Sequence, residues 1–245
     1  MVPLIHVFAL QQPILMNWSI LFSDVLRCER DSIGQERMAD SKDLNFIKEN
    51  NKCAVIVAHP DDETLWAGGL MLMHPEVDWT VVTLCRKSDP DRAPKFSKAL
   101  KKLNATGFMA DLDDGPEQRP LDNREVQKTI IELLPSKRFD LIITHSTSGE
   151  YTRHLRHEET AKAVLALWNS DRLYADELWT FAYEDGNREY LPRAIKQADL
   201  SVGLNNEIWR KKYDIITRIY GFSTDSFEAK TTPKEEAFWC LKAAC

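Results

Sequence analysis

One imidazole and three carboxylates follow directly on an apolar run near residue 53. Residues 53–58 read CAVIVA and lead into HPDDE, residues 59–63. Carboxylates placed side by side at the end of a buried segment repel each other and lose hydration, which is unfavourable. A bound cation relieves that repulsion. The cluster therefore predicts a metal site, rather than only an aspartate that caps the next helix.

A second polar cluster contains two histidines at helical spacing. Residues 144–160 read THSTSGEYTRHLRHEET, and His154 and His157 stand three positions apart. Residues at this spacing lie on one face of a helix. The pair alone is equally consistent with two solvated histidines. Combined with HPDDE it supplies the missing ligand, because two histidines and one carboxylate around zinc leave a position open for water.

The segments around these clusters alternate between strand and helix patterns. Apolar runs rich in β-branched residues predict strands at 53–58, 79–84, 139–144 and 178–183, with a weaker one near Phe108. Helical patterns fill the gaps at 62–73, 93–103, 123–134 and 157–169. This alternation predicts an α/β protein with a Rossmann-like three-layer fold and a mostly parallel central sheet.

The chain after residue 183 carries weaker signals. A short run, ADLSV at 198–202, precedes a helical pattern at about 206–219, and EEAFW at 235–239 predicts a helical turn that docks on the domain. No repeat or low-complexity linker divides the sequence. We therefore expect a single domain at residues 49–245, preceded by an N-terminal extension at residues 1–48.

The predicted topology brings the two polar clusters together. In open α/β sheets, ligands bind beyond the carboxyl ends of the strands. HPDDE follows the first predicted strand, and residues 145–157 follow the strand at 139–144, so both lie at the same edge. A dinucleotide site is excluded, because a phosphate-binding turn needs glycines, whereas this turn carries two acids that repel a pyrophosphate. Gly68 and Gly69 come too late and instead favour close contact between helix and sheet.

Composition excludes several classes of function. The chain has 245 residues and a net charge of -6, from 32 basic and 38 acidic groups. That balance argues against a nucleic-acid partner bound through its phosphates and against docking on an anionic membrane. The five cysteines form no CxxC pair. They predict a reducing compartment, the cytoplasm, and exclude a disulfide framework or a cysteine-ligated zinc.

The first residues are apolar without forming a membrane span. Polar residues interrupt the apolar stretch, and no lysine or arginine precedes Arg27, so neither a transmembrane segment nor a signal peptide is predicted. We interpret this extension as a dispensable leader, upstream of a start at Met38. The helical spacing of its apolar residues, Ile14, Trp18, Leu21 and Val25, leaves a docked helix or a weak membrane-surface anchor as alternatives.

The two clusters together resemble a known family, the PIG-L/LmbE-like zinc-dependent N-acetylglucosaminyl deacetylases. The resemblance rests on AHPDDE at 58–63 and on TH, GEY and HxxH within 144–157, with a fainter likeness in DLDDG at 111–115. It extends over about residues 52–222, and its first motif, in a strand-to-helix context, is the more specific one.

The resemblance implies a role for each matching residue. His59, Asp62 and His157 would bind Zn²⁺, and Asp61 would be the general base. Protonated His154 would lie beside the reacting carbonyl and stabilise its oxyanion, and either Asp61 or His154 would give a proton to the leaving amine. Zinc lowers the pKa of bound water to about 7, within reach of a carboxylate base.

The sequence departs from the family pattern at two places. The family shows HPDH where this chain has HLRH, so Arg156 replaces an acid that could orient the histidines, and Glu158 or Glu159 could substitute for it. After the second strand, LCRKSDPDR at 84–92 replaces a TRGE-like loop. Arg86 or Arg92 in this loop could contact a sugar or an anionic group, or could be solvated.

Other residues near the motifs have weaker claims. Tyr151 and Trp66 are the aromatic residues closest to the clusters, and we expect them as pocket walls. His145 could be a spare ligand, although a strand-end histidine satisfied by the backbone is the preferred interpretation. Trp79 and Trp179 fall in strand patterns and are expected in the core.

The predicted function is a zinc-dependent hydrolase that removes an N-acetyl or other N-acyl group from an amino sugar or glycoconjugate. Two alternatives stay open: an amidase for a thiol conjugate or other non-sugar amide, and a non-catalytic Rossmann-like module that binds a sugar or nucleotide. Histidine and carboxylate ligands also suit other divalent ions such as Fe²⁺. The expected partner is a small acetamido sugar substrate, and a homo-oligomer is left open.

Overall fold

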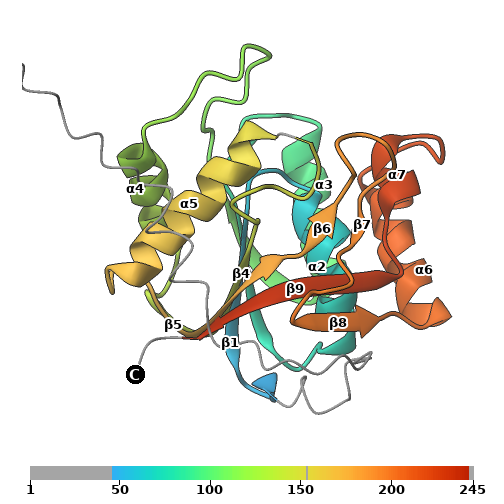
Figure 1. Cartoon of the computed structure of the whole chain (residues 1–245), viewed down its shortest axis with the longest axis horizontal. Helices are drawn as coiled ribbons and strands as arrows, with labels where there is room; N and C mark the ends of the chain where they lie inside the picture. Colours follow the sequence, from blue (N-terminus) through green and yellow to red (C-terminus); the bar gives the residue numbers. More distant parts are fainter. Residues whose placement is uncertain (1–45, 153, 243–245) are drawn as a thin grey trace, which may run out of the picture. The chain divides into compact units, whose positions relative to one another are not determined.

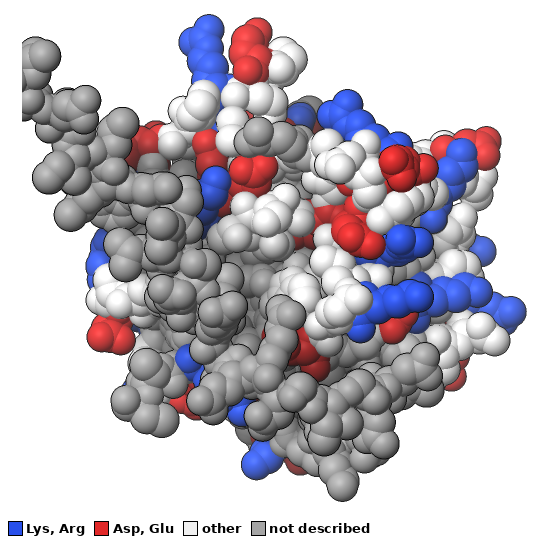
Figure 2. Space-filling view, in the orientation of Figure 1, with Lys and Arg blue, Asp and Glu red and all other residues white. Residues whose placement is uncertain are grey.

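A computed structural model of the chain describes residues 46–152 and 154–242. Almost all of the predicted N-terminal extension lies outside these residues, including Met38 and the apolar positions between Ile14 and Val25. None of the helices in the described ranges is long and apolar enough to cross a bilayer. On the face shown in Figure 2, basic and acidic side chains lie side by side rather than in one basic surface.

The centre of the domain is a seven-stranded sheet with the order β3-β2-β1-β4-β5-β9-β8. Its first five members pair in parallel. The other two add antiparallel pairs at one side. The sheet comprises β1 (Lys52–Val57), β2 (Asp78–Thr83), β3 (Ala105–Met109), β4 (Arg138–Thr144), β5 (Tyr174–Phe181), β8 (Leu200–Gly203) and β9 (Glu235–Lys242). The predicted mostly parallel sheet is confirmed.

Helices cover both faces of this sheet, as Figure 1 shows. One face carries α2 (Asp62–Met73), α3 (Arg92–Leu103), α6 (Asn206–Asp214) with the π-helical turn η2 (Ile215–Ile219), and α7 (Phe227–Thr231). The other face carries α4 (Asn123–Leu133) and α5 (Leu155–Asn169). A small two-stranded sheet pairs β6 (Tyr183–Glu184) with β7 (Arg193–Ala194). The three-layer architecture expected from the alternating pattern is therefore confirmed.

The central strand β1 explains why its sequence is continuously apolar. Cys53, Val55 and Val57 pack in the core beneath α2, whereas Ala54 and Ile56 pack beneath α4 and α5. A strand buried on both faces has no solvent-facing positions for polar residues. The run CAVIVA therefore marks the middle of the sheet.

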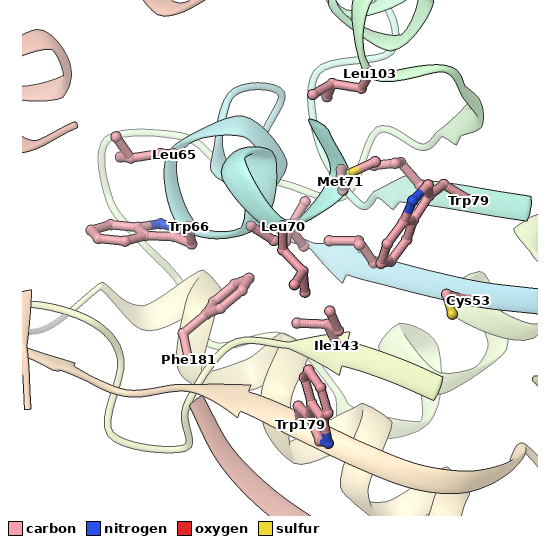
Figure 3. Packing of buried hydrophobic residues seen from close by; sticks show 14 of the residues in the cluster. Cys53, Leu65, Trp66, Leu70, Met71, Trp79, Leu103, Ile143, Trp179 and Phe181 are labelled. Carbon is pink, nitrogen blue, oxygen red and sulfur yellow. The ribbon is translucent and has the colours of Figure 1, made fainter. Parts of the chain in front are cut away.

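The core beneath α2 contains the large aromatic residues (Figure 3). Trp79 and Trp179 are buried there, as expected from their strand patterns. The expectation that Trp66 forms a pocket wall is wrong, because its side chain is 0% exposed and packs against Phe181 and Tyr183. Trp66 is buried because it lies within an apolar stretch of α2, although it is close to HPDDE in sequence.

The helical turn expected at EEAFW is also wrong. These residues begin β9, which pairs with β5 and β8. Phe238 points into the core beside Trp179 and Phe181, and the carboxylate of Glu236 is equally buried. In a strand with one buried face, every second residue is normally apolar. Glu236 occupies one of these buried positions, so the alternating apolar pattern of β9 is interrupted. Its partners lie far away in sequence, so the local pattern does not reveal them.

Candidate metal centre

The ends of β1 and β4 place the two polar clusters next to each other. The strands are parallel neighbours, with Ile56 opposite Thr144 in the register. The Thr144 hydroxyl donates a hydrogen bond of 2.7 Å to the Ile56 carbonyl oxygen, which ties the strand ends together. Residues 58–63 and 145–157 therefore leave the sheet at the same edge, as the topology predicted.

Asp62 lies at the centre of the site, in the first turn of α2. Its Oδ2 accepts a hydrogen bond of 2.8 Å from the His59 backbone N–H and lies 3.2 Å from His59 Nδ1. The same oxygen lies 3.4 Å from His157 Nε2. Although burial alone would raise the pKa of Asp62, the surrounding imidazoles hold it well below its usual range. Asp62 is thus an ionised acceptor facing nitrogens of His59, His157 and, at 3.5 Å, His145.

These distances fit a tetrahedral metal ion. Zinc–nitrogen and zinc–oxygen bonds of about 2.0–2.1 Å place neighbouring ligand atoms about 3.3 Å apart. Among the described residues His157 Nε2 is buried without a hydrogen-bond partner, although it faces a carboxylate oxygen. A buried imidazole nitrogen that no protein group hydrogen-bonds is suited to bind a metal ion. The residues therefore fit the metal that the family resemblance implies at His59, Asp62 and His157.

His154 lies beside this set. Its ring centroid is 4.8 Å from that of His59 and 4.2 Å from that of His157, and these three histidines also offer nitrogens within 4.8 Å of one another. Burial and the neighbouring imidazoles lower the pKa of His154 to about 3. The side chain is therefore a neutral hydrogen-bonding group here, which corrects the expected protonated imidazole.

Asp61 differs from its neighbour Asp62. Its backbone has a φ of 122°, a left-handed conformation unusual for a residue other than glycine. Its side chain contacts Arg92, whose Nη1 lies 3.2 Å from Asp61 Oδ2. Burial and the charge of Asp62 raise the pKa of Asp61 well above its usual range, and Arg92 opposes that shift only in part. The two adjacent carboxylates thus have opposite environments.

The carboxylate that contacts the histidines from behind the centre is Glu150, which the sequence reasoning did not nominate. Its carboxylate lies between His145 and His157 and contacts Nδ1 of both rings. The acids considered for this role lie elsewhere: Glu159 pairs with Arg156, and Glu158 contacts Lys162. The only sequence signal for Glu150 is its position in GEY, between the strand end and the HxxH pair.

Arg156 has a structural place rather than one in the metal centre. Its buried guanidinium donates to the carbonyl oxygens of Asp113 and Arg119 and pairs with Glu159. It therefore fastens the loop after β3 to α5. Arg156 stands where the family pattern has an acid, and the acid that contacts His145 and His157 is Glu150 instead.

The three candidate substrate contacts lie around the centre. Arg86 is 46% exposed and donates to Asp114, whose Oδ1 lies 3.2 Å from His59 Nε2. Arg92 covers the ring of Phe222 at 4.5 Å. Tyr151 packs edge-on against His157 and against Phe227, with ring centroids 5.5 and 5.1 Å apart.

Phe227 is an aromatic residue of the site that the sequence did not single out. It is 39% exposed, one of two large hydrophobic side chains in the described ranges that reach solvent to this extent. It comes from the segment between η2 and β9, far from both motifs in sequence. Only the fold brings it beside Tyr151.

Comparison with known proteins finds one matching family model and several solved structures of similar fold. A family model described as "PIG-L: GlcNAc-PI de-N-acetylase" matches residues 54–168. This match spans both polar clusters and confirms the resemblance seen in the motifs. A search of curated proteins found no significant match.

Several solved structures share the fold at low sequence identity. The N,N'-diacetylchitobiose deacetylase from Pyrococcus horikoshii aligns over 78% of this chain and 84% of its own, with a TM-score of 0.59 and 14% identity. The zinc-inhibited form of teicoplanin deacetylase Orf2 aligns over 78% and 98%, with a TM-score of 0.54 and 14% identity. GalB, the 4-carboxy-2-hydroxymuconate hydratase from Pseudomonas putida KT2440, aligns over 80% and 98%, with a TM-score of 0.52 and 14% identity.

Proposed function

We propose that this chain, which carries the PIG-L family signature in residues 54–168, is a metal-dependent hydrolase that removes an N-acetyl group from an acetamido sugar or glycoconjugate. The observation that carries the proposal is the convergence of His59, Asp62 and His157, with Asp61 beside them. The fold alone does not fix the reaction, because a hydratase shares it with the deacetylases. The site residues and the family match support hydrolysis.

The proposed mechanism divides the work between neighbouring side chains. A Zn²⁺ ion held by His59, Asp62 and His157 would supply Lewis acidity and lower the pKa of a water to about 7. Asp61 takes the proton from the attacking water and returns it to the leaving amine. His154, as a neutral imidazole, donates a hydrogen bond to the carbonyl oxygen as negative charge develops there.

The surroundings of the centre suit a sugar substrate. The exposed ring of Phe227 beside Tyr151 offers an apolar surface on which a sugar ring can stack. The half-exposed guanidinium of Arg86 can donate to hydroxyl oxygens or to an anionic group. Arg92 can exchange its contact with Asp61 for a substrate oxygen. These three residues, Arg86, Arg92 and Tyr151, are the proposed substrate contacts.

The proposal extends to domain bounds and location. We place the catalytic domain at residues 49–245 and treat residues 1–48 as an extension. Cys53 and Cys85 are free thiols in the core, which is consistent with a reducing compartment such as the cytoplasm.

A substrate panel tests this function. Purified protein, with zinc and with a chelator, is assayed for amine release from acetamido sugars, thiol-conjugate amides and simple N-acyl amides. We expect release from an acetamido sugar that the chelator abolishes. Release only from the other amides would make the protein a non-sugar amidase. Sugar binding without release from any substrate would make it a binding module.

A further inference from the structure

We propose that Glu150 and His145 are positioning residues that fix the tautomer and orientation of His157, and that their hydrogen-bonded chain ends on the backbone of Ala58. The inference rests on the proposed metal centre. It identifies residues outside the ligand set that orient one of the ligands. It concerns the binding of the metal, before any substrate is present.

The first observation is the convergence of donors on Glu150. Its side chain is 0% exposed. Its Oε2 lies 2.7 Å from His157 Nδ1 and 3.0 Å from His145 Nδ1, and its Oε1 accepts a hydrogen bond of 2.9 Å from the Ser146 backbone N–H. An ionised carboxylate only accepts hydrogen bonds. Both imidazoles therefore carry their proton on Nδ1 and donate it to the same oxygen.

The second observation fixes His145 from its other side. The Ala58 backbone N–H donates a hydrogen bond of 3.0 Å to His145 Nε2. Its Nε2 therefore carries a lone pair and its Nδ1 carries the proton, so contacts at both nitrogens specify one neutral tautomer. This use of Nε2 removes His145 from the ligand set, although that nitrogen lies 3.5 Å from Asp62 Oδ2. The sequence analysis preferred a His145 that hydrogen-bonds to the backbone. The structure shows that contact, and the same ring also contacts Glu150.

The consequence falls on His157. Because its Nδ1 donates to Glu150, its Nε2 presents a lone pair toward Asp62 Oδ2, 3.4 Å away. The ring is held in place by stacking on His145, with centroids 3.9 Å apart and planes 19° apart. Two lone pairs facing each other repel, and a divalent cation between them relieves that repulsion. The series of hydrogen bonds from Ala58 through His145 and Glu150 therefore determines which nitrogen of His157 faces the metal.

The expected magnitude follows from metal sites in general. Loss of a carboxylate that holds a ligand histidine typically weakens metal binding about 10- to 100-fold. Here the carboxylate is shared by two rings, so its loss also frees His145. We expect Glu150→Gln to show the larger effect, and His145→Phe, which keeps a ring in the stack but no Nδ1 donor, a smaller one.

The experiment measures metal affinity and tautomer separately. The zinc affinity of the purified full chain is determined by competition with a chelator for the wild type, Glu150→Gln and His145→Phe. The ¹⁵N chemical shifts of the imidazoles are recorded on zinc-loaded protein, because without the metal a proton would occupy His157 Nε2 opposite Asp62. We expect Nδ1–H tautomers for His145 and His157 in the wild type, and a mixture at His157 in Glu150→Gln. The expected loss of zinc affinity in this variant is about 10- to 100-fold.

Glu236→Gln is the matched control. Glu236 is equally buried and accepts several hydrogen bonds, but from Lys212 and the backbone of α2 rather than from an imidazole. We expect this variant to be less stable than the wild type and to keep its zinc affinity. It thereby separates a general loss of stability from a specific loss of metal.

The outcomes distinguish this inference from the proposed function. A wild-type protein that binds no zinc would overturn the metal centre itself. Tight zinc binding by both the wild type and Glu150→Gln, within about twofold, would overturn the positioning role alone. If Glu150→Gln does not fold, the wild-type spectrum decides, because an Nε2–H tautomer at His145 or His157 would contradict the inferred chain.

Discussion

At the scale of single residues, the centre shows how environment separates two identical side chains. Asp61 and Asp62 are adjacent in sequence, yet Asp62 faces imidazoles and the His59 backbone N–H, whereas Asp61 faces a guanidinium. The left-handed backbone at Asp61 turns the two carboxylates in different directions. In the proposed mechanism Asp62 holds the metal and Asp61 meets the attacking water.

This separation predicts different effects of conservative substitutions. We expect Asp61→Asn to keep its metal and lose about 10²- to 10⁴-fold in kcat, because an amide cannot accept the proton of water. The measurement is amine release together with the metal content of the purified variant. An Asp61→Asn protein as active as the wild type would remove Asp61 from the role of general base.

The cysteines give a second prediction at this scale. Burial raises the pKa of the Cys53 and Cys85 thiols to about 12, and nearby carboxylates add to the shift. At pH 8 both groups are therefore protonated in the folded protein, and a thiol is far less nucleophilic than a thiolate. We expect iodoacetamide at pH 8 to leave both unmodified until denaturant is added, as measured by mass spectrometry of peptides. Rapid labelling of the native protein would contradict their burial.

At the scale of elements, a buried ion pair joins α2, α6 and β9. Lys212 Nζ donates to Glu236 Oε1 at 2.6 Å, and both side chains are fully buried. The same carboxylate accepts from the backbone N–H groups of Gly69 and Leu70 in α2. Glu236 is thus anchored from two elements, which explains how a glutamate is accommodated at a core position of β9.

We expect the loss of one partner to cost more than the loss of both. Lys212→Met leaves an unpaired buried carboxylate and should lower the free energy of unfolding by about 3–5 kcal/mol. The double variant Lys212→Met, Glu236→Leu should be more stable than the single one, because no charge remains buried. Urea denaturation measures all three proteins. A double variant less stable than Lys212→Met would show that the unpaired buried charge is not the cause of the loss.

The two adjacent glycines of α2 allow a matched test of how closely this helix approaches Leu204, after β8, and Glu236, in β9. A Cβ on Gly69 would lie 2.5 Å from both Leu204 methyl carbons and 2.9 Å from Glu236 Oε1, whereas one on Gly68 would meet Thr64 Cγ2 at 3.3 Å. We expect Gly69→Ala to destabilise by about 1–3 kcal/mol through overpacking.

In Gly68→Ala the gain in helix propensity, up to about 1 kcal/mol, should offset the milder contact. Both variants are compared by urea denaturation. Equal stability of the two variants would contradict the close approach of α2 to Leu204 and Glu236.

The elements also show what the sequence can and cannot predict. The bounds of α2 are those expected from its apolar pattern and the proline that follows it, because local signals decide them. The strand β9 was missed because the partners of Glu236 are Lys212 and the backbone of α2, which no local pattern connects. Glu150 was missed for the same reason: its significance depends on two histidines that meet only after β4 and α5 have packed.

At the scale of the whole domain, the site combines segments from inside and outside the family match. The proposed metal ligands and the proposed general base all lie within residues 54–168, the range that the family model matches. Phe222 and Phe227, which contact Arg92 and Tyr151, come from the later segment that leads into β9. We therefore expect the chemistry to follow the family and the choice of substrate to depend on this later segment.

The most direct test of the account is the metal content of two purified proteins, the wild type and His157→Ala, after equilibration with zinc and removal of excess ion. Elemental analysis should find about one zinc per wild-type chain, as expected for a single centre with three protein ligands, and far less in the variant. Circular dichroism of the variant checks that it is folded. Equal zinc in both proteins, or none in the folded wild type, would contradict a metal centre built from His59, Asp62 and His157.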